Sequence, residues 1–409
     1  MNLMGKRLAV IKLLLGGRHL LPILLTVNSG WASVQPIRVR VLDNAPEIQV
    51  RGADRPGALE WKVSCRHHTV QLLPLGSTLE PQKSVRQSSV VFHPRGERIS
   101  VNRREYRGEI EVRSQGDACE VIDHLSVESY LRGVVNSEVS AQWSEESLAA
   151  QVIAARTYAY YQIEVAAGKK SRFDLDASVK DQVYEGSLKE NLRSTQIVDR
   201  TQGLILSAHR GARPDPIKAF YHSTCGGETE LPGKVWGGSY RGFKRKVACP
   251  FCRTSPAYSW SLELTSGDIV DAMQRGIGSS GSPSGWPKIP RDLFQAKNLL
   301  EVRPMSGFFN GRVGEVMTVW KGSATRFTLK LNASRFREWI GFSKLKSTWF
   351  QVQPRVLSDG GKDWVFQGRG NGHGVGMCQW GVKEMGAKGY RYASILHYYY
   401  PDAVLKKVW

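Results

Sequence analysis

The sequence predicts an α+β fold with a β-rich N-terminal part, a long central helix and a mixed inserted lobe. Three observations support this prediction. Short runs of alternating apolar and polar residues fill residues 34–120, an alanine-rich run with helical periodicity lies within residues 144–162, and strand-like runs around a Gly/Ser/Pro-rich stretch occupy residues 260–347. A period of two is typical of half-buried strands, whereas apolar residues spaced three and four apart are typical of helices.

Composition and charge narrow the class of protein. A chain of 409 residues with 41% hydrophobic residues can bury a sizeable core, as one large or two medium domains. Its formal net charge of +20 favours an anionic partner. We find no basic run interleaved with aromatic residues and no nucleic-acid motif, so nucleic acid is not the expected partner.

The N-terminus resembles a secretory signal. Four basic residues precede the apolar run from Leu20 to Val27, and Gly30 and Ala32 form a small-x-small cleavage site. Cleavage after Ala32 would remove residues 1–32 and lower the net charge from +20 to +16, because four basic residues and no acidic residue are lost. The apolar run is too short and interrupted for a stable membrane span. We therefore expect an exported protein, either periplasmic or extracellular.

The strands expected in residues 34–120 are separated by Gly, Pro, Asp and Ser turns. Cys65 and Cys119 both fall in this β region. A disulfide between them would suit an oxidising compartment, and two unrelated buried thiols are the alternative.

The central segment from Tyr130 to Gln162 combines a carboxylate with the long helix. Ser144 fits an N-cap, and the acidic residues after it complement the positive end of the helix dipole. Arg156 lies on the shoulder of the apolar stripe, where a guanidinium needs a partner. Glu138 is just upstream, in a lead-in that we expect to be non-helical, and could supply that partner. A structural salt bridge is the simplest interpretation.

A second cluster of polar and sulfur-containing residues follows the helix. His222-x2-Cys225 and Cys249-x2-Cys252 form two chelating pairs at the spacing of tetrahedral zinc sites. A disulfide from Cys225 to one of the other two cysteines is the alternative, at about even odds. Four protein ligands leave no open position on the metal, so such a zinc would be structural.

The remaining chain divides into a lobe and a glycine-rich segment. We expect residues 260–347 to form a lobe inserted into a catalytic domain of residues 33–259 and 348–409, and we find no catalytic motif in the lobe. Five alternating glycines then surround His373, and a helix is expected from Gln379 to Met385. Cys378 could pair with His373 as a nucleophile; we favour a small buried side chain instead.

Three blocks of the sequence resemble the SpoIID/LytB family. "YLRGVVNSEV" and "AARTY" around Glu138 and Arg156 are similar to family segments, with Val139 in place of the usual Met and Ala149 in place of a frequent Lys. "HSTCGG" is similar to a family "HSTSGG", with Cys225 in place of Ser. "GHGVGMCQWG" is similar to the family's C-terminal block, with Cys in place of Ser. The resemblance spans roughly residues 37–408.

The resemblance implies a function and roles for these residues. It implies a peptidoglycan lytic transglycosylase that cuts the MurNAc–GlcNAc β-1,4 bond of peptide-stripped glycan strands and leaves 1,6-anhydroMurNAc ends. Glu138 would be the catalytic acid and base, and Arg156 its orienter or a sugar ligand. Ser223, His373 and Gln379 would contact the glycan in a groove, and no cofactor would be needed for the chemistry. The alternative is a non-catalytic, glycan-binding enhancer of a cell-wall amidase.

Overall fold

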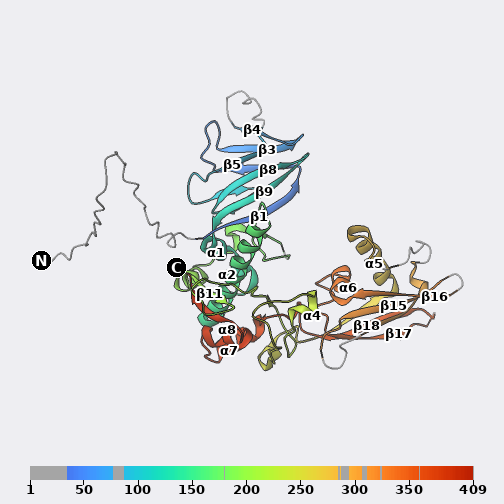
Figure 1. Cartoon of the computed structure of the whole chain (residues 1–409). Coiled ribbons are helices and arrows are strands. Elements are labelled where there is room, and N and C mark those ends of the chain that lie inside the picture. Colours follow the sequence, from blue (N-terminus) through green and yellow to red (C-terminus); the bar gives the residue numbers. More distant parts are fainter. Residues whose placement is uncertain are drawn as a thin grey trace, which may run out of the picture. The chain divides into compact units, whose positions relative to one another are not determined.

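The computed structural model describes residues 35–76, 87–178, 180–283, 286, 294–305, 311–322, 325–358 and 360–408. Figure 1 labels their helices and strands. The predicted signal peptide, residues 1–32, lies outside the described residues. Mixed helices and sheets confirm the predicted α+β class.

The N-terminal part is β-rich, as the alternating pattern predicted. It holds two five-stranded sheets, with strand orders β10-β1-β9-β8-β5 and β4-β3-β2-β6-β7. Neighbours are antiparallel except for the parallel pair of β1 and β10. A disulfide joins Cys65 on β3 to Cys119 on β9, which links the two sheets and confirms the pairing over two separate thiols. The strands are β1 (Pro36–Ala45), β2 (Glu47–Arg51), β3 (Glu60–Arg66), β4 (Thr69–Leu75), β5 (Ser89–Phe92), β6 (Ile99–Val101), β7 (Arg104–Tyr106), β8 (Glu109–Gln115), β9 (Ala118–Ser126) and β10 (Leu175–Asp176).

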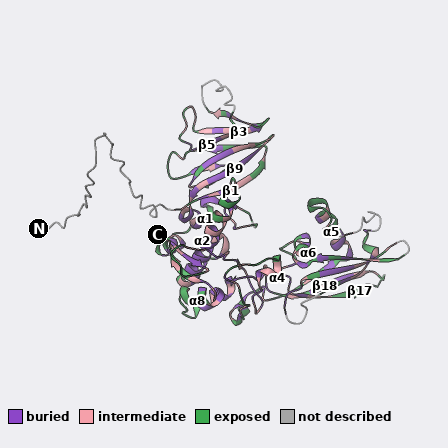
Figure 2. Ribbon diagram, in the orientation of Figure 1, coloured by how far each residue is buried: buried purple, intermediate pink, exposed green. Residues whose placement is uncertain are grey.

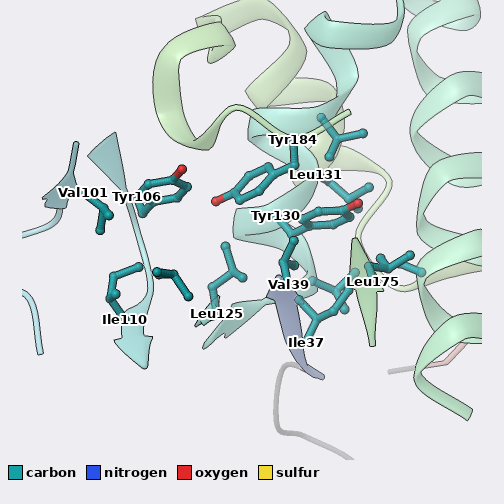
Figure 3. Packing of buried hydrophobic residues seen from close by; sticks show 14 of the residues in the cluster. Ile37, Val39, Val101, Tyr106, Ile110, Leu125, Tyr130, Leu131, Leu175 and Tyr184 are labelled. Atoms are coloured by element: carbon teal, nitrogen blue, oxygen red, sulfur yellow. The ribbon is translucent and has the colours of Figure 1, made fainter. Parts of the chain in front are cut away.

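One hydrophobic core joins both sheets to the first two helices. Figure 3 shows the rings of Tyr106, Tyr184 and Tyr130 between the strands and helix α1 (Val127–Glu138). The Tyr184 ring lies 6.1 Å from the Tyr106 ring and 5.1 Å from the Tyr130 ring. The Tyr184 hydroxyl donates to Asp123 Oδ2 at 2.9 Å, and burial raises the pKa of Asp123 to about 7. This packing fixes the helix that carries Glu138.

Helix α2 (Glu145–Gly168) is the central element. The Ser144 side chain accepts a hydrogen bond from Ser147 N, which confirms the predicted N-cap. Every residue from 147 to 159 is buried, and Figure 2 shows α2 as a largely buried helix. The prediction of a single buried stripe was therefore wrong, because neighbouring elements cover the helix on all sides.

The segment after α2 contains short elements that pair with the C-terminus. Strand β11 is antiparallel to β20, and β12 is parallel to β19, which places the "HSTCGG" turn beside the glycine-rich loop. These elements are η1 (Gly186–Lys189), α3 (Leu192–Arg200), β11 (Leu204–Ser207), β12 (Tyr221–His222), α4 (Pro232–Trp236), η2 (Pro250–Thr254), β19 (Met377–Cys378), α7 (Gln379–Ala387), α8 (Tyr392–Tyr399) and β20 (Val404–Lys407).

The remaining elements form a lobe with two three-stranded sheets, β13-β18-β17 and β14-β15-β16. Its hydrophobic core runs from Trp260 to Phe366, so the predicted boundary at residue 347 falls inside it. The elements are β13 (Ser259–Thr265), α5 (Ser266–Ser280), η4 (Ala296–Asn298), β14 (Leu299–Pro304), β15 (Glu315–Lys321), β16 (Arg326–Asn332), α6 (Ala333–Ile340), β17 (Phe350–Val356) and β18 (Lys362–Arg369). No helix in the described part of the chain is long and apolar enough to cross a membrane.

Candidate active site

Glu138 is the last residue of helix α1, so the expectation that it lies in a non-helical lead-in was wrong. The helix begins after Ser126, whose side chain accepts a hydrogen bond from Ser129 N, and it gives way to extended backbone at Val139. The C-terminal end of a helix carries partial negative charge, which disfavours an ionised carboxylate there. Position alone therefore favours a protonated Glu138.

Three hydrogen bonds hold the Glu138 carboxyl group. Val183 N donates to Oε1 at 3.4 Å, and Gln379 Nε2 donates to Oε2 at 3.5 Å. The Tyr221 hydroxyl makes the third. Burial raises the pKa of Glu138 above its ordinary value, and the three hydrogen bonds offset part of that rise. The carboxyl group is thus held in one orientation and biased toward its protonated form.

The partners of Glu138 are themselves fixed from the core. Gln182 Nε2 donates to the Tyr221 hydroxyl at 2.8 Å, and Gln182 Oε1 accepts from the Tyr130 hydroxyl at 3.1 Å. Gln182 and Tyr130 are fully buried. Because the Tyr221 hydroxyl accepts from Gln182, its own proton is free to point at Glu138.

A groove of about 1200 Å³ begins at this network. Tyr221, which bonds to Glu138, and Gln182, which bonds to Tyr221, both line it, whereas Glu138 itself is not among the described lining residues. His373 from the glycine-rich loop lines it as well, as predicted from the sequence. Side chains of helix α6 in the lobe also line the groove, although the sequence analysis found no chemistry in the lobe. The volume is slightly above the ~300–1,000 Å³ of typical small-molecule pockets, which leaves room for more than one sugar ring.

The glycine-rich loop needs glycine for its close approaches. Gly372 has φ of 104°, and a Cβ atom there would lie 2.8 Å from the Cβ of His222. Gly376 has φ of 70°, and a Cβ atom would lie 2.1 Å from the carbonyl oxygen of Phe220. A residue with a side chain at either position would have an unfavourable positive φ and would clash with the neighbouring atoms. The loop therefore packs its backbone against β12 and presents His373.

His373 is held as a neutral ring. Its Nδ1 accepts a hydrogen bond from Val375 N at 3.0 Å, and the ring also bonds to the backbone of Tyr221. Burial lowers its pKa well below the ordinary value, and the neighbouring His222 and Arg312 lower it further. Both ring nitrogens of His373 are thus bonded to backbone groups, and the groove meets the carbon edge and face of an uncharged ring.

Arg156 does not contact Glu138, contrary to the predicted pairing. Its guanidinium has no exposed surface and forms a bidentate ion pair with Glu128, at 2.8 and 2.7 Å. It also donates to the carbonyl oxygens of Val198 and Leu204. The roles of orienter and sugar ligand are therefore replaced by a structural one, which ties α2 to α1, α3 and β11.

We expect the variant Arg156→Met to lower the free energy of unfolding by about 3–5 kcal/mol, because it leaves the carboxylate of Glu128 buried without its partner. Chemical denaturation measures this, and the double variant with Glu128→Gln should recover part of the loss. The specific activity of the folded fraction should be unchanged. A normal stability with a raised KM would instead assign Arg156 to the substrate.

The structure places the other two predicted glycan contacts, Gln379 and Ser223, in different surroundings. Gln379 bonds to Glu138, as described above. Ser223 is absent from the described lining of the groove; its hydroxyl lies 3.4 Å from that of Thr224, and its carbonyl oxygen accepts from Trp380 N at 3.1 Å. Ser223 thus joins the "HSTCGG" turn to α7 through its backbone.

Four buried thiols form a cluster, with a membership that differs from the prediction. The Sγ atoms of Cys225, Cys249, Cys252 and Cys378 all lie within 4.8 Å of one another, and none is in a disulfide. Cys378 replaces the predicted His222. The His222 Nδ1 atom bonds to the carbonyl oxygen of Val375 at 3.0 Å, and His222 is not among the four grouped ligands. The parallel pairing of β12 and β19 is what brings Cys378 to the site.

Polar groups surround the cluster in the way that suits thiolates. Cys225 N lies 3.3 Å from Cys378 Sγ, and the Tyr399 hydroxyl lies 3.1 Å from Cys249 Sγ. The buried guanidinium of Arg312 donates to the carbonyl oxygen of Cys225 at 3.0 Å, which adds a positive charge beside the sulfurs. Four sulfurs around one zinc at ~2.3 Å would be ~3.8 Å apart, and Cys225 and Cys252 are 3.5 Å apart. The cluster could hold one tetrahedral metal ion.

Sequence reasoning missed several residues in the groove. Asp181 is one of the two carboxylates among the described lining residues, and it accepts hydrogen bonds from Tyr158 and Gln162, each at 2.8 Å. Lys218 and Trp236 add a cation and an exposed indole. The signal for Trp236 was present, since a tryptophan before two glycines is a plausible exposed turn. The positions of Asp181 and Lys218 depend on how distant segments meet, which spacing does not reveal.

Comparisons with known proteins match this chain to wall-related families. A family model described as stage II sporulation protein matches residues 115–207, which include Glu138 and all of α2. An uncharacterised protein of Brachyspira hyodysenteriae is 30% identical over 326 residues, which cover 77% of this chain and 76% of the relative.

Two relatives from Bacillus subtilis have descriptive names. Stage II sporulation protein D is 29% identical over 295 residues, covering 68% of this chain and 74% of the relative. Amidase enhancer is 28% identical over 307 residues, covering 67% of this chain and 40% of the relative.

Proposed function

The chain belongs to the SpoIID family, and on that premise we propose that it acts on the cell wall as a peptidoglycan lytic transglycosylase. The observation that carries the proposal is Glu138, a partly buried carboxyl group with a raised pKa, fixed by Val183, Tyr221 and Gln379 next to a groove. A general acid must be protonated at working pH and oriented; burial raises the pKa of Glu138, and its hydrogen bonds orient the carboxyl group.

In this reaction one carboxyl group acts first as the general acid and then as the general base. Glu138 gives its proton to the oxygen between C1 of MurNAc and C4 of GlcNAc. The C1–O bond breaks, and its electron pair leaves with the GlcNAc oxygen. The ionised carboxylate then takes the proton of the muramyl 6-hydroxyl while O6 bonds to C1. The product is a 1,6-anhydro end, no water is consumed, and Glu138 is protonated again.

The hydrogen bonds to Glu138 serve both halves of this cycle. Burial favours the protonated form for the first step, and the donors Val183 N, Gln379 and Tyr221 stabilise the carboxylate that exists between the steps. Hydrolysing glycosidases use two carboxyl groups. Asp181 lines the groove, so if the products are those of hydrolysis, Asp181 is the candidate for the second carboxyl group.

A non-catalytic role is the alternative, favoured by the similarity to a protein named Amidase enhancer. In that case the groove would bind glycan and a separate amidase would act. The test is to incubate purified protein, without any amidase, with stem-free and stem-bearing glycan strands and to measure the loss of strand length. Shortening of the strands supports the transglycosylase, while binding without shortening, together with stimulation of an added amidase, supports the enhancer.

We propose further that the four thiols bind a structural zinc ion. The sulfur geometry, the neighbouring donors and the buried Arg312 support this. Zinc would join the "HSTCGG" turn, η2 and β19 and so fix the loop that carries His373 and the residue Gln379. It would take no part in the reaction, because all four positions are occupied by protein ligands.

We also propose that the protein is exported across the membrane. The basic and apolar pattern of residues 1–32 supports it, as does the disulfide between Cys65 and Cys119, which is typical of oxidising compartments. The glycan strands of the wall lie in such a compartment.

A further inference from the structure

We propose that the groove is built for an acidic glycan, with Trp236 as the platform for one sugar ring and Lys218 as the site for a carboxylate on the neighbouring sugar. This inference rests on the proposed cell-wall function and names the part of the substrate that each residue recognises. The acid group is the lactyl carboxylate of a muramyl residue whose peptide stem has been removed.

Trp236 has the geometry of a stacking platform. It is the last residue of α4 and lies on the groove with 43% of its surface exposed, a large value for an indole. The Phe220 ring stacks against it at 4.6 Å with an interplanar angle of 25°, and the His373 ring lies 5.0 Å away. The supported ring cannot fold down into the groove, so part of the indole stays open. The C–H face of a pyranose can cover such a surface at little cost in conformational entropy.

Lys218 is a cation held in place by aromatic rings. Its Nζ lies 5.2 Å from the ring centre of Phe220 and 5.7 Å from those of Tyr158 and Tyr161. In the described part of the chain it has no ion pair within 4.0 Å, although Asp181 is close enough to influence its pKa. Cation–π contacts orient the ammonium group without neutralising it. Phe220 touches both Lys218 and Trp236, which places the two binding elements side by side on one wall.

The charge of the whole groove agrees with an anionic occupant. Cations outnumber carboxylates among its lining side chains, and α6 of the lobe supplies two of the cations. The lining cations are Lys180, Lys218, Lys234, Arg335 and Arg337, and the lining carboxylates are Asp181 and Glu338. A neutral β-1,4 glycan would gain nothing from this excess, whereas stem-free muramyl glycan carries one carboxylate in every disaccharide. Lys218 is joined to the platform through Phe220, which contacts both side chains.

The test measures glycan binding in the Glu138→Gln background, where cleavage does not interfere. The ligands are stem-free muramyl glycan and chito-oligosaccharides, which share the β-1,4 backbone but lack the lactyl carboxylate. We expect Trp236→Ala to weaken binding of both ligands by roughly 30-fold, the effect of losing a buried aromatic anchor. We expect Lys218→Met, which keeps the alkyl stem, to weaken binding of the muramyl glycan by about tenfold and to leave chito-oligosaccharide binding unchanged.

Arg326→Ala is the matched control, because it removes an exposed cation of the lobe that does not line the groove. Circular dichroism and thermal unfolding check that each variant is folded. Unchanged binding in Trp236→Ala, or equal losses for both ligands in Lys218→Met, would overturn the inference. Since binding is read without turnover, the proposed reaction can fail while this inference holds, and the reverse.

Discussion

Replacing Glu138 by Gln should lower kcat/KM for glycan cleavage by about 10³-fold, because general acid–base catalysis by one positioned group contributes 10²–10⁴-fold. Gln has nearly the same shape and can keep a hydrogen bond, but its amide cannot give up a proton to the glycosidic oxygen. Glycan binding should change by less than about threefold, since the change affects the transition state rather than the bound sugar. Steady-state cleavage and equilibrium binding measure the two effects separately.

A matched control is Glu145→Gln on the neighbouring helix α2. Glu145 is exposed and pairs with Arg200 on the surface, so its change should alter the rate by less than about twofold. Equal losses in the two variants would mean that the effect at Glu138 is structural. Full activity in Glu138→Gln would remove it from the mechanism.

The pH dependence of the rate follows from the same carboxyl group. The active form is protonated, so cleavage should be fast below the pKa of Glu138 and fall as the pH rises through it. Burial raises that pKa, and the hydrogen bond from Gln379 lowers it. Gln379→Met removes the donor, which should raise the pKa further and move the alkaline limb of kcat/KM to higher pH. A shift to lower pH would contradict the assignment.

Replacing Cys378 by Ser should remove the bound metal and lower the melting temperature strongly, because structural zinc contributes folding free energy directly. We expect purified protein to contain about one zinc ion per chain, lost in Cys378→Ser and retained in His222→Asn. Elemental analysis gives the metal content, and thermal unfolding gives the stability. The comparison also distinguishes the four-thiol site from the set with His222 that sequence spacing suggested.

The alternative is that the four cysteines pair as disulfides in the oxidising compartment. In that case the protein would contain no metal, and thiol titration of the unfolded chain would find no free cysteine. Four thiols released by a chelator together with denaturant would support the zinc site. The disulfide between Cys65 and Cys119 should persist in both cases, which makes it an internal standard.

Much of the fold was predictable because local pattern decides it. The alternating runs gave the N-terminal strands, and Ser144 marked the start of α2. The spacing of cysteines pointed to Cys225, Cys249 and Cys252, because two residues between ligands is a local constraint. Glu138 was found through the motif around it, whereas the groups that hold its carboxyl required the structure.

The errors concern groups whose neighbours come from distant segments. Arg156 was given Glu138 as a partner because that carboxylate lies in the segment that leads into the helix, whereas the packing of α1 against α2 places Glu128 against it. Cys378 was taken for a small buried residue because nothing in its own segment suggested a ligand. The parallel pairing of β12 with β19 brings Cys378 to the other three thiols. A pairing between strands so far apart in the chain cannot be predicted from residue spacing.

The boundaries of the lobe also depend on contacts between distant segments, which the sequence pattern does not reveal. Its strands could be located, but its sheets include β17 and β18, which lie beyond the predicted boundary. The contribution of α6 to the groove could not be predicted from the sequence, because cationic residues on a short amphipathic helix usually face solvent. The pairing of strands across the lobe was the missing information.

The most direct test of the central claim is the mass spectrum of the sugar ends that the wild-type protein leaves on stem-free glycan strands. The account predicts 1,6-anhydroMurNAc ends from the wild type and none from Glu138→Gln. Reducing MurNAc ends, which are heavier by one water molecule, would contradict the transglycosylase mechanism and indicate hydrolysis with a second carboxylate. Intact strands in both samples would contradict catalysis altogether.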